Sequence, residues 1–151
     1  MNGRGAFTET PAWKAGAWET EISRMPVYHV WFATKRRKWL LQGDVLDAVR
    51  EAIVEAAEHH NIRLIEHEAI VDHVHLLLDG EDKPALSKAL NLLKGRSARR
   101  IFLRFPELKL DANTNSFWQA GYGAKIVPDG AQAAVGRYIR TQWDRLEGFE
   151  R

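Results

Sequence analysis

Two histidines stand two residues apart in the largely apolar stretch 71–78, and this pair constrains the fold more than any other feature of the sequence. Because side chains alternate along a strand, His73 and His75 are expected on one face and Val74 on the other. Neutral imidazole is a common metal ligand, so the pair is a candidate half of a divalent metal site. Half-buried, hydrogen-bonded histidines are the commoner reason for such a pair in a strand, so the pair by itself leaves both interpretations open.

The length and composition are those of a single globular domain. The chain has 151 residues, of which 45% are hydrophobic, enough to bury a core. No uncharged apolar run reaches the roughly 18 residues that span a bilayer, and residues 1–24 lack the apolar block of a secretory signal. We therefore expect a cytoplasmic protein with a poorly packed N-terminal extension over 1–24 and one domain over 25–151. The absence of cysteine excludes disulfides and thiolate catalysis.

The spacing of apolar residues and turn signals predicts an α+β fold. A tight connection at Val71 and Asp72 is expected to join the second strand to the third, which carries the histidine pair. The order of elements is that of a ferredoxin-like split βαβ sandwich, a four-stranded antiparallel sheet with helices on one face plus a C-terminal helix. Strands are expected over 27–33, 62–70, 73–78 and 117–127, helices over 45–60, 82–105 and 131–143, and a loop over 108–116.

Local signals set the expected ends of the helices. Asp44 is expected to cap the first helix and Asn61 to stop it. Pro84 falls in the first turn of the second helix, where its missing N–H does no harm, and Pro106 ends that helix. Gly95 lowers helix stability by about 1 kcal/mol relative to alanine, which makes it a candidate for a break or a close backbone approach.

Basic residues gather in two runs, although the formal net charge is only +2. Local basic surface can bind phosphate even when the total charge is small, so both runs are candidate DNA-binding residues. For either run taken alone, a solvated face is the simpler interpretation. The residues are Lys35, Arg36, Arg37 and Lys38 in the first run and Lys94, Arg96, Arg99 and Arg100 in the second.

Tyr138 and Gln142 are four residues apart in the last predicted helix, so they are expected on one face, one turn apart. A tyrosine on an amphipathic helix usually lies at the rim of a core, and a glutamine is usually solvated. The amide oxygen of a glutamine is also a hard ligand suited to Mg²⁺ or Mn²⁺, and a phenol one turn away would then lie beside the metal.

Several motifs follow one another in a characteristic order between residues 26 and 143. They are Tyr28-His29-Val30-Trp31, Lys35-Arg36-Arg37-Lys38, Asp72-His73-Val74-His75-Leu76-Leu77, Leu93-Lys94-Gly95-Arg96-Ser97-Ala98-Arg99, Phe105-Pro106-Glu107-Leu108, Phe117-Trp118-Gln119-Ala120-Gly121-Tyr122 and Tyr138-Ile139-Arg140-Thr141-Gln142. In these motifs the chain resembles the single-tyrosine HUH transposases of bacterial insertion sequences, the TnpA type of the IS200-like family. It departs from the family at Val71, where proline is usual, and in residues 1–24, which are longer than the usual start.

The resemblance implies a site and a reaction. His73 and His75 would be the metal ligands of the HUH motif, Gln142 the third protein ligand and Tyr138 the nucleophile. The implied reaction cleaves and rejoins single-stranded DNA through a 5′-phosphotyrosine intermediate, with Mg²⁺ or Mn²⁺ as the metal. The implied partners are DNA hairpins near the ends of an insertion element and a second copy of the chain in a homodimer, with no nucleotide cofactor and no membrane.

Three other functions stay open from the sequence. A domesticated relative would cut hairpin DNA at dispersed genomic repeats, and a catalytically silent relative would bind hairpins without chemistry. A metal phosphoesterase would use a water nucleophile and would have no need of Tyr138. The presence of His73, His75, Tyr138 and Gln142 together favours an active transposase over a silent binder.

Overall fold

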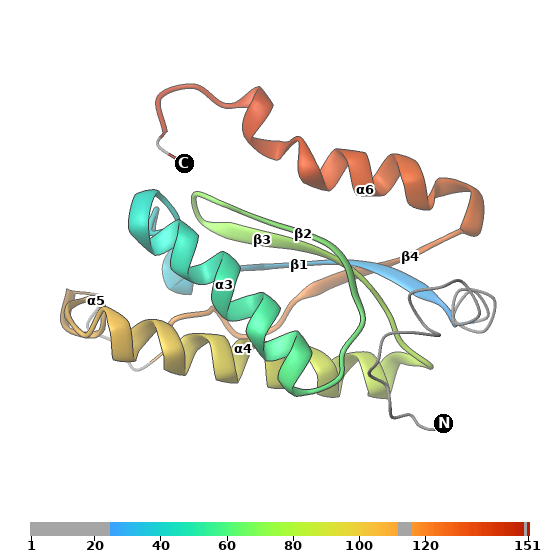
Figure 1. Cartoon of the computed structure of the whole chain (residues 1–151), viewed down its shortest axis with the longest axis horizontal. Helices are drawn as coiled ribbons and strands as arrows, with labels where there is room; N and C mark the ends of the chain where they lie inside the picture. Colours follow the sequence, from blue (N-terminus) through green and yellow to red (C-terminus); the bar gives the residue numbers. More distant parts are fainter. Residues whose placement is uncertain (1–24, 112–115, 150) are drawn as a thin grey trace.

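A four-stranded antiparallel sheet organises the chain in the computed structural model, which describes residues 25–111, 116–149 and 151 (Figure 1). The predicted extension over 1–24 lies outside the described residues. The strands are β1 (Val27–Ala33), β2 (Leu64–Ile70), β3 (His73–Asp79) and β4 (Gly123–Val127). The helices are α3 (Gly43–His59), α4 (Lys83–Arg104), α5 (Glu107–Asp111) and α6 (Gln132–Arg140), with short 3-10 turns η1 (Lys35–Arg37), η2 (Asp129–Ala131) and η3 (Gln142–Arg145).

The sheet has the predicted split βαβ arrangement. The strand order is β2-β3-β1-β4, so β1 and β3 lie side by side in the middle although α3 and β2 separate them in the sequence. All three strand pairings are antiparallel. The register pairs Trp31 of β1 with His75 of β3 on one side and with Gly123 of β4 on the other. The predicted α+β fold class is therefore confirmed.

The two faces of the sheet are covered by different helices. Figure 1 shows α3 and α4 together on one face and α6 across the other. Strand alternation matches this division, because Val30, Val74 and Leu76 are fully buried in the main core on the α3 and α4 side. A smaller apolar cluster on the other face includes Leu77 of β3 and Ile139 of α6. The predicted layering, with a separate C-terminal helix, is confirmed.

Of the two predicted ends of α3, one is confirmed and the other is wrong. Asn61 stops the helix as predicted, in the left-handed conformation with φ +55° that asparagine adopts more readily than most residues. The prediction that Asp44 caps the helix is wrong, because the carbonyl of Gln42 already accepts the amide of Leu46 and the helix begins at Gly43. The buried stripe consists of Leu46, Ala48, Val49, Ala52, Ile53, Ala56 and Ala57.

A single uninterrupted helix, α4, spans 22 residues. Asp82 caps its start by accepting a backbone amide of the first turn at 2.9 Å, and Pro84 lies in that turn as predicted. Gly95 neither breaks the helix nor marks a close approach, because an added Cβ would meet no atom within 4 Å. The helix ends at Arg104, before Pro106. Within the described part of the chain, neither α4 nor any other helix has the length and apolar character needed to cross a membrane.

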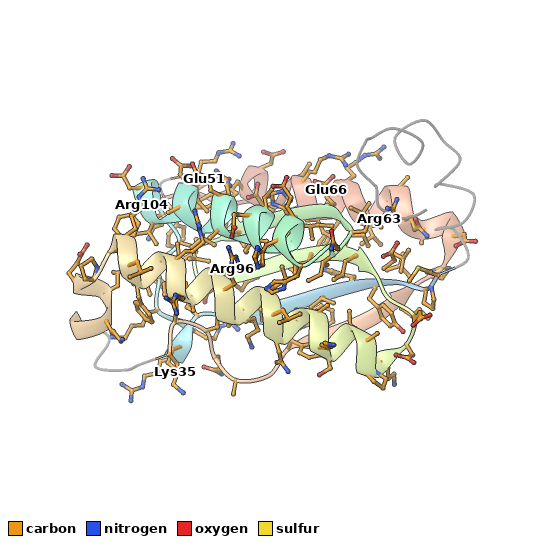
Figure 2. The ribbon with its side chains drawn as sticks, turned by 60° about the horizontal axis from the view of Figure 1, so that its bottom comes forward. Lys35, Glu51, Arg63, Glu66, Arg96 and Arg104 are labelled. Atoms are coloured by element: carbon orange, nitrogen blue, oxygen red, sulfur yellow. The ribbon has the colours of Figure 1, made fainter. Side chains whose placement is uncertain are left out.

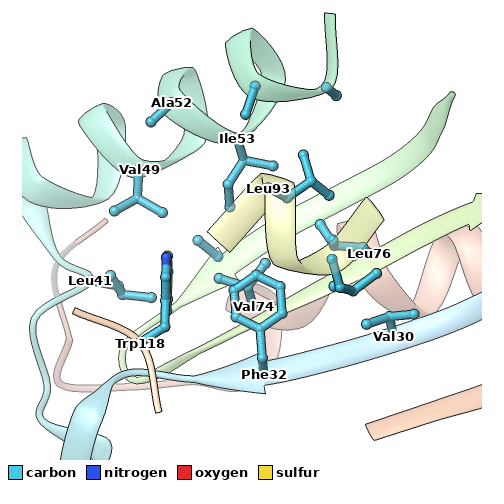
Figure 3. Packing of buried hydrophobic residues seen from close by; sticks show 14 of the residues in the cluster. Val30, Phe32, Leu41, Val49, Ala52, Ile53, Val74, Leu76, Leu93 and Trp118 are labelled. Atoms are coloured by element: carbon cyan, nitrogen blue, oxygen red, sulfur yellow. The ribbon is translucent and has the colours of Figure 1, made fainter. Parts of the chain in front are cut away.

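The main core fills the space between the sheet and the layer of α3 and α4 (Figure 3). Trp118, from the loop before β4, packs edge-on against Phe32 at a ring-centroid distance of 4.8 Å and lies near Leu41. Its indole N–H donates to the Oγ of Ser97 on α4 at 3.0 Å, and Ser97 is fully buried. This bond attaches the loop before β4 to the helix layer.

Two predicted boundaries differ from the structure because the residue at the boundary hydrogen-bonds to a carbonyl of the preceding helix. β2 begins at Leu64 instead of 62, since the amide of Ile62 still donates to a carbonyl of α3 at 2.8 Å. The last helix ends at Arg140 instead of 143, since Thr141 leaves helical φ/ψ and its hydroxyl donates to the carbonyl of Arg137 at 2.8 Å.

The region before β4 also differs from the prediction. The described part of the predicted loop over 108–116 includes most of α5. The predicted strand over 117–127 is a continuous strand only from Gly123 onward. Before it, Trp118 makes one isolated antiparallel bridge with Thr34, and Phe117 and Trp118 lie in the core, 2% and 5% exposed. Apolar and aromatic residues suit a buried strand and a buried loop equally well, so the local pattern did not separate the two.

Ser97→Ala is expected to lower the free energy of unfolding by about 1–3 kcal/mol, because the buried indole N–H of Trp118 would lose its acceptor. Urea unfolding followed by circular dichroism measures this change. Ser87→Ala, on a more exposed turn of the same helix, is the matched control and is expected to change the stability little. Equal small effects of both substitutions would contradict the role given to this bond.

Candidate active site

The histidine pair lies on the face of the sheet that α6 crosses. His73 and His75 share this face of β3, as the strand alternation predicts, and Val74 between them is buried in the main core. The register pairs His75 with Trp31, so His29, two residues before Trp31, is a diagonal neighbour of His75. Three imidazoles therefore meet on the two central strands.

These imidazoles and one carboxylate form a continuous chain of polar contacts. Oδ1 of Asp72 lies 2.8 Å from Nδ1 of His73. Nε2 of His73 lies 3.1 Å from Nε2 of His75, and Nδ1 of His75 lies 2.9 Å from Nε2 of His29. The two predicted ligands thus point their Nε2 atoms at each other, and each has its Nδ1 atom on a different partner.

Burial disfavours positive charge on His75 and His29. His75 is only 8% exposed, and burial, together with the nearby His73 and His29, lowers the pKa of His75 to about 3. Burial first, and then the charge of Lys125, also lowers the pKa of His29. A metal binds neutral imidazole, and the surroundings of His75 keep it neutral.

The turn between β2 and β3 holds Asp72 in place. The backbone amide of Thr34 donates to the carbonyl of Asp72, and the amide of Leu41 donates to that of Val71, both at 2.9 Å. Val71 has φ +50°, a left-handed conformation that is rare for a β-branched residue. Proline, whose φ is locked near about −65°, does not adopt this conformation, so the departure at Val71 goes with a particular shape of the turn.

Tyr138 of α6 lies over the histidine cluster. Its ring centroid is 5.8 Å from that of His75 and 6.0 Å from that of His29, in both cases edge-on. The guanidinium carbon of Arg145 lies 5.2 Å from the centre of the same ring, within the range of a cation–π contact. The tyrosine is 46% exposed, so it is open to solvent above the cluster.

Three contacts attach the segment on both sides of the tyrosine to the sheet. Ile139 is fully buried in the smaller apolar cluster. The indole N–H of Trp143 donates to the carbonyl of Ala69 in β2 at 2.8 Å. Arg140 and Glu66 form an ion pair at 2.7 Å. Together these contacts position α6 and η3 against β2 and β3 of the same chain.

Gln142 was predicted to lie in the last helix. In the structure α6 ends before it, and Gln142 is the first residue of η3. Its amide nitrogen donates to the carbonyl of Tyr138 at 2.8 Å, so its amide oxygen is the atom suited to bind a metal. Gln142, Tyr138 and His73 line one cavity of about 380 Å³, together with Asp72 and the ring of Trp39. The structure therefore brings the predicted third ligand and the predicted nucleophile to the same cavity as one predicted histidine ligand.

The donor atoms suit a divalent metal. Two Nε2 atoms 3.1 Å apart have the separation of neighbouring ligands at metal–nitrogen bonds of about 2.1 Å. His29 contacts the opposite nitrogen of His75 and does not converge on that point. Among the described residues no three His, Cys, Asp or Glu side chains are grouped to hold a metal. Gln142, which lines the cavity together with His73, offers a hard amide oxygen of the kind that Mg²⁺ and Mn²⁺ bind.

His29 is the residue of this site that the sequence analysis left without a role. It lies in a strand between the buried residues Tyr28 and Val30, so alternation alone places it on the opposite face from them. That alternation was the available signal. Its contact with His75, 46 positions further along the chain, depends on the register of two strands and has no local signal.

The first basic run lies at the edge of this site. Nε of Arg37 is 3.2 Å from Oδ2 of Asp72, whose other carboxylate oxygen contacts His73. Arg36 and Arg37 are both exposed, with φ +59° and +52°, in the 3-10 turn directly after β1. One carboxylate therefore links the basic run to a predicted metal ligand.

The second basic run lies on α4, on the opposite face of the sheet. Arg96 makes two 2.8 Å hydrogen bonds with Glu55 of α3, and Arg100 lies 3.8 Å from the same carboxylate. Figure 2 shows Arg96 where α4 meets α3. Lys94 donates to two backbone carbonyls of the loop before β4 at 2.8 and 2.7 Å, and Arg99 is exposed. These contacts join structural elements, and the DNA-binding role of this run stays a prediction.

The chain matches a known transposase family along most of its length. The sequence model of the IS200-like transposases matches residues 24–142, which contain the whole sheet and the predicted site residues. The chain therefore belongs to the IS200-like transposase family, whose reaction is DNA transposition.

Two curated relatives illustrate the match. The ISDra2 transposase TnpA of Deinococcus radiodurans is 32% identical over 118 residues, which are 78% of this chain and 84% of that protein. The transposase for insertion sequence element IS200 of Salmonella typhimurium is 32% identical over 115 residues, which are 76% of this chain and 75% of that protein.

Solved structures agree with this assignment. The crystal structure of a transposase from Deinococcus radiodurans R1 has a TM-score of 0.62 at 32% identity, covering 77% of this chain and 89% of that one. The REP-associated tyrosine transposase bound to a REP hairpin shares the fold at a TM-score of 0.57 and 13% identity, covering 80% of this chain and 67% of that one. The predicted family and fold are confirmed.

Acid is expected to destabilise the metal-free protein as the pH falls from about 6.5 toward 3. The unfolded chain takes up protons near the ordinary histidine value of 6.5, whereas native His75, with its pKa lowered to about 3, stays neutral. The unfolded state therefore binds more protons in this window, and a single such histidine contributes a slope of at most about 1.4 kcal/mol per pH unit.

Urea unfolding in EDTA across this pH window measures the slope. His75→Asn is expected to flatten it, because the shifted group is gone. The exposed His59, at the end of α3, supplies the matched control His59→Asn, which is expected to leave the slope unchanged. An unchanged slope in His75→Asn would contradict the assignment.

Proposed function

We propose that this chain cleaves and rejoins single-stranded DNA through a covalent bond between Tyr138 and a 5′-phosphate, with Mg²⁺ or Mn²⁺ held by His73, His75 and Gln142. The observation that carries the proposal is the meeting of these residues at one place. The Tyr138 ring lies 5.8 Å from His75 and shares a cavity with His73 and Gln142. Membership of a transposase family supports a DNA strand-transfer reaction at this site.

Tyr138 acts as the nucleophile in this proposal. Its phenolic oxygen attacks the scissile phosphorus, the bond from phosphorus to the 3′ oxygen breaks, and that oxygen takes up a proton as the phenolic proton is lost to solvent. In the second transfer a 3′-OH attacks the phosphotyrosine, loses its proton, and returns the phenol of Tyr138. The phosphotyrosine keeps the energy of the phosphodiester bond, so the reaction needs no nucleotide cofactor.

The other residues of the site orient the ligands and offset negative charge on the DNA. When bound, the metal would offset the negative charge on the scissile phosphate. Asp72 fixes the ring of His73 through its 2.8 Å contact. Arg145 places a positive charge beside the nucleophile, 5.2 Å from the centre of its ring. Trp39, 64% exposed at the rim of the same cavity, offers an aromatic face to an unpaired base.

We assign the path of the DNA mainly to residues 35–38, because this basic run adjoins the site through the contact between Arg37 and Asp72. Arg99 and Arg100, on the far face, provide a second region of positive charge. A hairpin is the proposed substrate, which the hairpin-bound REP-associated tyrosine transposase supports through its common fold.

A homodimer is also part of this proposal, on the basis of the family resemblance. Within the described chain Tyr138 lies beside His75 of the same copy. An exchange of α6 between two copies would have to break the ion pair of Arg140 with Glu66 and withdraw the indole of Trp143 from β2.

Tyr138→Phe is expected to abolish a covalent protein–DNA adduct. The assay incubates the protein with Mg²⁺ and labelled single-stranded hairpins taken from the DNA that flanks its own gene, and reads the adduct on a denaturing gel. The wild-type chain is expected to form the adduct, and EDTA is expected to prevent it. The loss follows because phenylalanine lacks the attacking oxygen.

Tyr122→Phe is the matched control for this assay, since Tyr122 packs against the main core and is expected to be dispensable for the adduct. An adduct that survives in Tyr138→Phe would show another nucleophile. One that forms fully in EDTA would remove the metal from the proposed reaction.

The double variant Arg36→Gln and Lys38→Gln is expected to weaken binding of single-stranded DNA. The slope of log affinity against log salt is expected to become shallower by about 0.7 for each phosphate that the variant no longer neutralises. Fluorescence anisotropy with a labelled hairpin at several salt concentrations measures both quantities. Lys88→Gln, an exposed lysine of α4, is the control, and an equal effect there would count against the assigned path.

A further inference from the structure

His29 makes a polar contact that the proposed reaction does not use. Its Nε2 lies 2.9 Å from Nδ1 of His75, the nitrogen opposite the one that faces His73. The two ring centroids are 5.0 Å apart, with an angle of 31° between the ring planes. The diagonal positions of the two residues on β1 and β3 produce this geometry.

Asp72 decides where the protons of the cluster lie without metal. A carboxylate only accepts, so Nδ1 of His73 is the donor in their 2.8 Å contact. If each imidazole holds one proton, Nε2 of His73 has none, and the 3.1 Å contact between the two Nε2 atoms needs the proton of His75. His75 is left to accept at Nδ1, so His29 donates to it from Nε2.

This distribution of protons is incompatible with metal binding, because His75 carries its proton on the nitrogen that would ligate. Ligation through both Nε2 atoms requires the proton of His75 on Nδ1. That N–H then points at Nε2 of His29, which must accept and carry its own proton on Nδ1. Each imidazole holds one proton before and after, so two protons change position and none is released overall.

We propose that His29 is the positioning residue that sets the tautomer of His75, donating to its Nδ1 without metal and accepting from the same atom with metal bound. The inference rests on the proposed function, because it takes His75 as a metal ligand. Asp72 orients His73 in a similar way but only as an acceptor. Among the contacts of His75, His29 is suited to the change because a neutral imidazole donates from one nitrogen and accepts at the other.

The packing around His29 holds its ring in place for this role. The ring of Trp31 lies 5.1 Å from it, and that indole occupies the space above Gly123, where an added Cβ would collide with it. Lys125 of β4 is paired with His29 across the sheet. Tyr138 closes the third side, with its ring centre 6.0 Å away.

Two amides of different reach at position 29 test the proposal. A glutamine places its amide near the position of imidazole Nε2 and can still contact His75, whereas an asparagine ends near the position of Nδ1 and falls short. Mn²⁺ binding by calorimetry is expected to stay within about 3-fold of wild type in His29→Gln and to weaken by about 10–100-fold in His29→Asn. His67→Asn is the control and is expected to bind Mn²⁺ as the wild type does. His67 is paired with Leu76 of the main core, so it lies on the sheet face opposite the site.

Nitrogen-15 NMR of labelled histidines reads the tautomers directly. In the wild-type chain, addition of Mg²⁺ is expected to move the protons of His29 and His75 together from Nε2 to Nδ1. Equal Mn²⁺ affinity of His29→Gln and His29→Asn, or a His29 that keeps its tautomer while His75 changes, would overturn the role of His29 alone. A wild-type chain that binds neither metal would instead overturn the proposed metal site.

Discussion

The pairing of β1 with β3 is the interaction on which the rest of this structure depends. Its register sets His29 diagonally beside His75 and opposes Trp31 to His75 on the face that carries the site. Because side chains alternate, a slip of one residue would turn the histidines of one strand into the main core and its apolar residues outward. The buried residues on the opposite face, such as Val30 and Val74, oppose that slip. The same packing that stabilises the domain therefore positions the site.

The two faces of the sheet differ in how firmly they are covered. The layer of α3 and α4 buries a large apolar cluster, which Trp143 of η3 also joins. By contrast, α6 buries Ile139 in the smaller cluster and makes one partly exposed ion pair. An exposed ion pair contributes little stability, in the range of about 0–1 kcal/mol. The predicted nucleophile therefore stands on the element with the smaller apolar contact, while the predicted histidine ligands stand on the central strands.

Some structural features of this protein can be predicted from the local sequence, and others cannot. The common face of His73 and His75 was predictable because strand geometry alone sets it. Tyr138 and Gln142 stay one turn apart although α6 ends between them, because the side-chain amide of Gln142 donates to the backbone carbonyl of Tyr138. The apolar, aromatic neighbourhood of Trp118 predicts a strand, but the structure gives this residue only one isolated bridge, to Thr34, within a buried loop that its indole attaches to α4.

The sequence by itself determined which side chains share a strand face, where the long helix starts, and which motifs mark the transposase family, because these depend on neighbouring residues. Tertiary structure decided which partner each polar group meets. Arg96, counted with the DNA-binding residues, is engaged by Glu55, while Arg37 reaches the carboxylate that orients His73. The contact between His29 and His75 arose in the same way, since partners far apart in the chain are chosen by strand register and helix packing, which no local pattern encodes.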